Sequence, residues 1–196
     1  MIPNISIQNP YYNYPDDINE LKELKELVKD GAASISARVY ALEKLFPEFK
    51  KYIEKRDTRK FIYFGFFEEV KLLVEAGADV NYEEPEGLTV FPSEATPLFV
   101  AIENNKEDIM KFLIHKGADV NKTDKRKFFT PLSLAVSRKK LWALELLLKH
   151  GADSNQEDRF GLTPLRYTYK GMNGSDGWSS LYQKMADLLI KYGAKV

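Results

Sequence analysis

The two histidines of this sequence are its side chains best suited to proton transfer or metal binding. His115 and His150 stand two residues and one residue before glycines that close similar apolar runs. No serine or acidic residue recurs with them at the spacing of a catalytic triad. Because a helix C-terminus favours positive charge, a capping role explains both histidines, and we predict no catalytic role for them.

Other motifs that carry chemistry are missing from the sequence. Without cysteine, the chain offers no disulfide, thiolate nucleophile or cysteine-based zinc site. The glycines of GMNGSDG (171–177) lack the spacing of a phosphate-binding loop, and the scattered acidic residues do not follow a calcium-loop pattern. We therefore expect a non-enzymatic protein with no cofactor and no metal.

Net charge and apolar runs restrict the partner and the compartment. The 29 basic and 29 acidic side chains cancel, so no overall charge points to nucleic acid or a membrane surface. The chain shows no secretory signal and no apolar run of membrane length. We predict a cytoplasmic protein that binds neither nucleic acid nor membrane, with secretion without a classical signal as the alternative.

One turn sequence occurs four times and indicates the elements that position these residues. It reads EAGADVN (75–81), HKGADVN (115–121), KHGADSN (149–155) and KYGAKV (191–196), each time after an apolar run with helical spacing. The glycine supplies the left-handed backbone position that ends a helix. The recurring aspartates are expected to bond to local backbone rather than to a ligand.

A second signal, Thr-Pro-Leu, stands between these turns at 96–98, 130–132 and 163–165. Threonine can cap a helix with its hydroxyl, and proline suits the first helical turn. Thr96 and Thr130 are 34 residues apart, and Thr130 and Thr163 are 33 apart. Two helices in a repeating unit of this length predict a solenoid.

Two segments combine the cap, the apolar face, the Gly-Ala-Asp turn and the period, and they resemble ankyrin repeats. They are TPLFVAIENNKEDIMKFLIHKGADVN (96–121) and TPLSLAVSRKKLWALELLLKHGADSN (130–155). The resemblance implies an all-α ankyrin-repeat solenoid of stacked helix-turn-helix units. Each unit is followed by a short, protruding, β-hairpin-like finger, which lies between a Gly-Ala-Asp turn and the next Thr-Pro-Leu. It also implies a non-catalytic module that binds a protein partner.

The sequence predicts three regions. Helices are expected at 16–31, at 34–46 and again from 47 onwards, and tyrosines lie among asparagine and proline before them. We expect a monomer, with end-to-end self-association through the last helix as the alternative. The regions are an extended arm at 1–15, a helical N-terminal capping region at 16–55, and ankyrin repeats at 56–196, approximately 56–88, 89–129, 130–162 and 163–196.

Three features depart from the repeat pattern. The first finger carries an insertion, VFPSEA (90–95), and KGMNGSDGWSS (170–180) interrupts the last repeat, where its glycines predict a flexible loop. Asn105 and Lys139 stand where the family has a glycine between its two helices, a position that Gly65 occupies in an earlier, degenerate repeat. We expect the backbone of those two turns to be more strained than it would be with glycine.

The sign of the charge changes from one finger to the next: the first is acidic, the second basic and the third mixed. EEPE (83–86) is followed by KTDKRK (122–127) and then by QEDRF (156–160). We expect KTDKRK to be a solvated tip, because the neighbouring acidic finger would repel a polyanion. Exposed phenylalanines within a charged rim are typical of a protein-binding surface. Trp142 is either a second anchor or a cover for the loop that holds Trp178.

The family resemblance implies that the fingers and the first helix of each repeat line the partner-binding surface. Carried over by position, the predicted surface consists of Tyr82, Glu84, Phe91, Phe99, Glu103, Lys125, Lys127, Phe128, Ser133, Arg159, Phe160, Arg166 and Tyr169.

Two biological roles fit such a module: an inhibitor or immunity protein, and a secreted host-directed effector or adaptor. The sequence does not choose between them. The remaining alternative is an enzyme with its activity in the diverged N-terminal region. That region has no histidine and no glycine besides Gly31, so we do not favour it.

Overall fold

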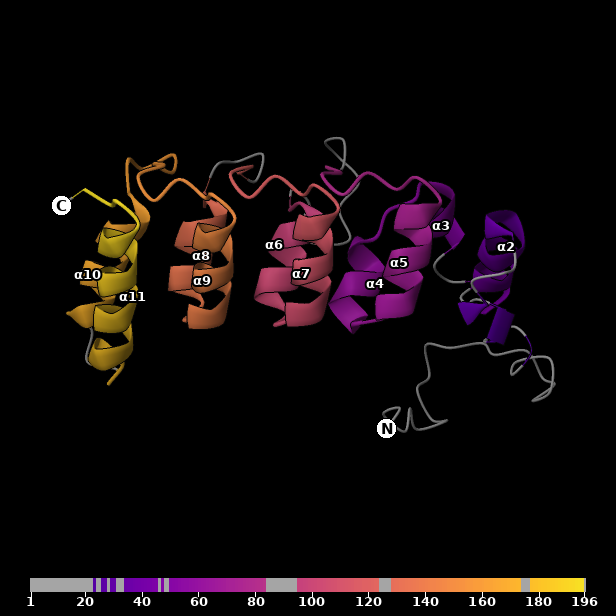
Figure 1. Cartoon of the computed structure of the whole chain (residues 1–196), viewed down its shortest axis with the longest axis horizontal. Helices are drawn as coiled ribbons and strands as arrows, with labels where there is room; N and C mark the ends of the chain where they lie inside the picture. Colours follow the sequence, from indigo (N-terminus) through magenta and orange to yellow (C-terminus); the bar gives the residue numbers. More distant parts are fainter. Residues whose placement is uncertain are drawn as a thin grey trace. The chain divides into compact units, whose positions relative to one another are not determined.

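The computed structural model describes residues 23, 26–27, 29–30, 34–45, 47, 50–83, 95–123, 128–173 and 177–195 (Figure 1). Among these residues the regular structure is helical and there is no strand, which confirms the predicted all-α class. The helices, labelled as in Figure 1, are α2 (Ile35–Leu45), α3 (Lys50–Glu54), α4 (Arg59–Phe64), α5 (Phe67–Glu75), α6 (Pro97–Glu103), α7 (Glu107–His115), α8 (Pro131–Ser137), α9 (Leu141–Lys149), α10 (Pro164–Met172) and α11 (Ser179–Lys191).

The chain divides into two compact units. The first consists of Met1–Lys60 and Phe66–Asp79, and the second of Phe61–Gly65 and Val80–Val196. In the first unit α2 packs against α3 and α5, and Arg38 of α2 forms a 2.9 Å ion pair with Glu75 of α5. The predicted helix at 34–46 is confirmed as α2.

The third helix predicted from residue 47 is wrong in one respect, because two short helices replace it. Arg56 adopts a positive φ of 53° after α3, a left-handed conformation that interrupts a helix. The Asp57 Oδ1 then accepts a 3.0 Å hydrogen bond from the Arg59 backbone N–H at the start of α4. The Arg59 side chain is buried and pairs with Asp57 at 2.7 Å, so this pair stands in for the Thr-Pro-Leu start of the later repeats.

Within the second unit, helix pairs stand in a row, and the segments that follow α7 and α9 leave the pairs at the same end (Figure 1). Thr96, Thr130 and Thr163 cap α6, α8 and α10 with their hydroxyls, and a proline follows each threonine. Thr130 and Ser133 form a reciprocal capping box at the start of α8. The predicted Thr-Pro-Leu starts are therefore confirmed.

The turns between paired helices need a left-handed backbone even where glycine is absent. Gly65 has a φ of 81°, and Asn105 and Lys139 have φ values of 57° and 58°. Asn105 and Lys139 thus adopt the left-handed backbone that glycine favours, while the expected strain of these two turns stays a prediction. Each of the two side chains contacts a tryptophan of the next repeat, as described below.

Three asparagines clamp successive turns of the second unit together. The Asn81 Nδ2 donates to the Gly117 carbonyl at 3.2 Å, and the Asp119 N–H donates to the Asn81 Oδ1 at 2.8 Å. Asn121 makes the same two bonds one repeat later, at 3.4 and 2.7 Å, and Asn155 makes them at 2.9 and 2.8 Å. The clamps satisfy glycine carbonyls that the helix ends leave without a helical partner.

The aspartates of these turns bond locally, as predicted. The Asp119 Oδ1 accepts from the Asn121 N–H at 2.8 Å, and the Asp153 Oδ1 accepts from the Asn155 N–H at 2.8 Å. These bonds hold each clamp asparagine at a fixed distance from the end of its own helix.

The last repeat corrects the flexible loop predicted at 170–180 where the structure describes it, and residues 174–176 of that segment lie outside the described residues. The helix α10 continues to Met172, and α11 begins at Ser179, so much of the extra sequence lengthens the two helices. A Cβ at Gly171 would lie 2.3 Å from the Tyr182 ring, which packs into the space that the glycine leaves. The glycine that suggested a loop is therefore a close-approach site between α10 and α11.

We predict that Asn121→Ala lowers the free energy of unfolding by about 1–2 kcal/mol, because two turn-to-turn hydrogen bonds are lost. Urea unfolding followed by circular dichroism measures the change. Asn173→Ala, at an exposed asparagine after α10, is the matched control and should change stability by less than about 0.5 kcal/mol. Equal effects of the two substitutions would contradict the clamp.

Gly171→Ala should lower the free energy of unfolding by about 1–3 kcal/mol, because the added methyl group overlaps the buried Tyr182 ring. The same substitution at a relaxed helical site would raise stability, since alanine favours helices. Lys170→Ala, at the preceding exposed position, is the control. A more stable Gly171→Ala protein would contradict the packing described here.

Candidate functional site

The third finger is built around one buried carboxylate. The Asp158 Oδ1 accepts hydrogen bonds from the backbone N–H groups of Phe160 (2.8 Å) and Leu162 (3.0 Å). The Asp158 Oδ2 accepts from the Tyr167 hydroxyl of α10 at 2.5 Å. The Gly161 N–H donates to the Asp158 carbonyl at 3.0 Å, with Gly161 at a φ of 67°. These bonds fold the finger so that Arg159 and Phe160 form its tip.

The tip of this finger meets the end of the second finger in one aromatic and cationic cluster. The guanidinium carbon of Arg159 lies 4.7 Å from the ring centre of Phe128 and 5.6 Å from that of Phe160. The two rings are 5.9 Å apart and inclined at 31°. We call these residues the Phe128–Arg159–Phe160 cluster. Cation–π and ring contacts of this geometry are attractive and hold the three side chains together.

The cluster is accessible and has a supported base. Phe160 is 62% exposed although its backbone is fixed, and Arg159 is exposed beside it. Phe129, next to Phe128 in the chain, packs against Tyr167 with ring centres 5.8 Å apart. An exposed aromatic ring on a fixed backbone loses little conformational entropy on binding, so this arrangement suits an anchor in a protein interface.

The structure places the other predicted surface residues in different environments. Glu103 is half-buried and pairs with Arg138 of the next repeat at 2.8 Å. Tyr82 is half-buried, and Arg166 and Tyr169 are exposed on α10. The remaining positions with predicted roles in the first two fingers lie outside the described residues: Glu84, Phe91, Lys125 and Lys127.

Two residues of the predicted surface need correction, because they are buried. Phe99 is 3% exposed and Ser133 is 0% exposed, so neither side chain faces a partner. Both follow Thr-Pro-Leu, on helices α6 and α8, and α8 packs against both α6 and α10. The same position in the last described repeat is the exposed Arg166. Burial here depends on the neighbouring helix pair and not on the repeat pattern alone.

Both tryptophans contact the preceding repeat. The Trp142 indole N–H donates to the Asn105 Oδ1 at 3.2 Å, and the Lys139 Nζ lies 4.8 Å from the Trp178 ring centre. Trp142 is half-buried, and the sequence predicted one of two roles for it, an anchor or a cover for the loop that holds Trp178. The structure gives it a different contact, with the preceding inter-helix turn.

Sequence reasoning missed the bonds that tie adjacent fingers to one another. The Lys122 Nζ donates to the Asn81 carbonyl at 2.8 Å and lies 3.6 Å from the Glu83 carboxylate. The Gln156 side chain donates to the Asn121 carbonyl at 2.9 Å. Both side chains directly follow a clamp asparagine, and this recurrence is the signal that could have revealed them.

The histidines and acidic residues form no metal centre in the described part of the chain. His115 is the last residue of α7 and His150 follows α9, and both are exposed, as their predicted positions at helix ends require. Among the described residues, no group of three or more histidine or acidic side chains is placed to hold a metal ion. None of the described helices has the length and apolar character needed to span a membrane.

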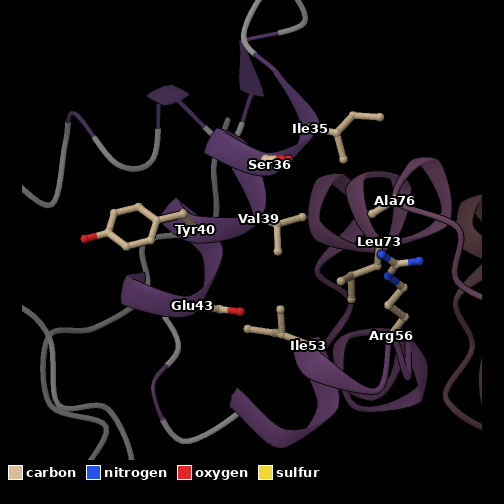
Figure 2. A pocket seen from close by; sticks show the side chains of 9 residues that line it. All are labelled: Ile35, Ser36, Val39, Tyr40, Glu43, Ile53, Arg56, Leu73 and Ala76. Carbon is tan, nitrogen blue, oxygen red and sulfur yellow. The ribbon is translucent and has the colours of Figure 1, made fainter.

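A separate pocket of about 290 Å³ lies in the first unit, among α2, α3 and α5 (Figure 2). Val39, Ile53 and Leu73 point into it, while Glu43 and Arg56 add opposite charges to its wall. These residues form no catalytic constellation, since they include no paired nucleophile and base.

Comparison with known proteins identifies the repeats. Two family models match the chain, "Ankyrin repeats (3 copies)" at residues 59–124 and "Ankyrin repeats (many copies)" at residues 113–167. Together they span residues 59–167, which is more than half of the 196 residues. The predicted family resemblance is thereby confirmed.

Curated relatives share the repeats over part of their length. Ankyrin repeat and SOCS box protein 6 of Mus musculus is 29% identical over 108 residues, covering 53% of this chain and 24% of that protein. The Homo sapiens protein of the same name is 33% identical over 66 residues, covering 34% of this chain and 14% of that protein. This chain thus spans at most about a quarter of these relatives.

Burial, followed by the hydrogen bond to Asp158, raises the pKa of the Tyr167 phenol above its ordinary value of 10.0. The neutral phenol therefore stabilises the fold fully below about pH 10, and this contribution is lost as the pH rises through the raised pKa. We predict that the stability difference between the wild type and Tyr167→Phe is constant below about pH 10 and shrinks above it. Urea unfolding of both proteins across this range measures the difference; a difference that grows at high pH would contradict the Asp158 bond.

Proposed function

Since the chain belongs to the ankyrin repeat family, a family of protein–protein interaction modules, we propose that it binds a protein partner through its second and third fingers without catalysing a reaction. The Phe128–Arg159–Phe160 cluster is the centre of the proposed surface. Interface anchors are enriched in aromatic and arginine side chains, and here both kinds stand on one fixed finger.

The single observation that carries this proposal is the combination of exposure and rigidity at Phe160. Its side chain is 62% exposed, whereas its backbone N–H is bonded to the buried Asp158 at 2.8 Å. Water contact with an aromatic ring of this size is unfavourable, and covering the ring with a partner removes that cost. Because the Phe160 ring lies outside the core, its exposure brings the fold no stabilisation that would offset this cost.

Neighbouring fingers support the proposed surface by lateral bonds. Lys122 and Gln156 each donate to a backbone carbonyl of the preceding finger, at 2.8 and 2.9 Å. A surface held in this way loses less conformational entropy on binding than a set of independent loops. Tyr82, Glu103, Arg166 and Tyr169 extend the proposed surface, and the positions outside the described residues stay predictions.

The roles of inhibitor, immunity protein, effector and adaptor all begin with this binding step and stay predictions. We propose inhibition as the first role to test, because a rigid module that covers a partner's surface also blocks access to it. Adding the purified protein to an activity assay of its partner separates the cases: an inhibitor lowers the activity in proportion to occupancy, and an adaptor leaves it unchanged. The cytoplasmic location also stays a prediction.

We predict that Phe160→Ala weakens partner binding at least about tenfold, because an exposed anchor ring is removed. Its free energy of unfolding should change by less than about 1 kcal/mol, since the ring lies outside the core. Photo-crosslinking from a benzoylphenylalanine at position 160 in native cells identifies the partner, and its affinity is then measured by calorimetry.

Tyr40→Ala is the matched control, because Tyr40 is also exposed (57%) but lies on α2 of the first unit. It should leave partner affinity unchanged. Phe99→Ala calibrates the stability assay, since removing a buried ring costs about 3–5 kcal/mol. Equal loss of affinity from Tyr40→Ala and Phe160→Ala, or a large stability loss from Phe160→Ala, would remove the basis for the proposed surface.

A further inference from the structure

We infer that Arg159 binds a carboxylate of the protein partner, so that the partner segment on the Phe128–Arg159–Phe160 cluster is an acidic peptide. This inference rests on the proposed function and adds the chemistry of the segment that binds. It follows from how the guanidinium is held, from what its acidic neighbours already bind, and from the exposed ring beside it.

The Arg159 guanidinium is positioned by rings and not by an acid. Its carbon lies 4.7 and 5.6 Å from the ring centres of Phe128 and Phe160, and the side chain is exposed. No ion pair joins it to a carboxylate among the described residues. Aromatic rings engage the faces of a guanidinium, and the N–H groups at its edge remain able to donate to a planar acceptor.

The acidic neighbours of Arg159 do not fill that acceptor role. Asp158 is buried and uses both carboxylate oxygens within its own finger, for the N–H groups of Phe160 and Leu162 and for the Tyr167 hydroxyl. The Glu157 carboxylate lies near Gly161, 3.9 Å from the position of a Cβ built there. The third finger thus presents a cation, Arg159, that the carboxylates of the same finger do not pair with.

Two other cations of the second unit differ from Arg159 in this respect. Lys122 lies 3.6 Å from the Glu83 carboxylate and donates to the Asn81 carbonyl. Arg138 is paired with Glu103 at 2.8 Å. A partner carboxylate would have to displace existing partners at these two sites, whereas at Arg159 it adds a bidentate pair.

The surroundings favour a carboxylate over a phosphate. Glu157 and Asp158 place negative charge beside Arg159, and a doubly charged phosphate is repelled more strongly than a singly charged carboxylate. The Phe160 ring lies 5.6 Å from the guanidinium carbon and is 62% exposed, so the partner residue next to the acid should be aliphatic or aromatic. The expected segment therefore combines Asp or Glu with an adjacent apolar side chain.

The test uses a phage-displayed random dodecapeptide library selected on the full chain. We expect selected sequences enriched in Asp or Glu next to an apolar residue. For the best synthetic peptide, Arg159→Gln should raise the dissociation constant about tenfold to a hundredfold, and Arg159→Lys should recover only part of the affinity, because lysine lacks the planar fork. Lys149→Gln, at an exposed cation ending α9, is the control for net charge and should have little effect.

Several outcomes would overturn the inference. Selected peptides without acidic enrichment, or acidic peptides whose affinity is unchanged by Arg159→Gln, reject a carboxylate at Arg159. A phosphoserine in place of the acidic residue that tightens binding shows that the site prefers phosphate. If selected non-acidic peptides lose affinity with Phe160→Ala but not with Arg159→Gln, the proposed binding surface stands and only its assigned chemistry fails. Thermal unfolding of each variant confirms that it folds.

Discussion

The hydrogen bonds between successive Gly-Ala-Asp turns are the constraint on which the second unit depends. Each helix pair ends at a glycine whose carbonyl has no helical partner, and the asparagine of the preceding turn donates to it. The side-chain oxygen of the same asparagine accepts a hydrogen bond from the backbone N–H two residues after that glycine. A turn is therefore complete only when its neighbour is in register, and stacking of the buried faces and pairing of the turns reinforce each other.

Because the turns are fixed, the bases of the fingers are fixed as well. The residues that stabilise a finger therefore differ from those that are available to bind a partner. At the third finger, Asp158 and Tyr167 hold the backbone, while Arg159 and Phe160 point outwards and contribute little to the core. Substitutions at the tip therefore act mainly on what the finger binds, whereas substitutions at its base act on whether the finger forms.

Local signals at fixed offsets could be read from the sequence, and contacts between repeats could not. Thr130 and Gly117 act within their own helix pair, so caps and turns followed from residue type and spacing. The burial of Phe99 is decided by the neighbouring helix pair, which no local pattern reports. Gly171 was misread as a loop residue because its reason for being glycine is the Tyr182 ring on another helix. The Asp158–Tyr167 bond escaped notice for the same reason, since it joins a finger to a helix.

The proposed specificity of this chain depends on local and not on overall charge. The 29 basic and 29 acidic residues cancel, so overall charge does not favour one class of partner. What distinguishes one surface site from another is whether its charges already have partners. Lys122, Arg138 and Asp158 already have partners within the chain, and Arg159 lies against the rings of Phe128 and Phe160. Under the proposed binding, a partner that brings an acid and an apolar side chain to the same finger is favoured, because that combination satisfies the guanidinium and covers the ring together.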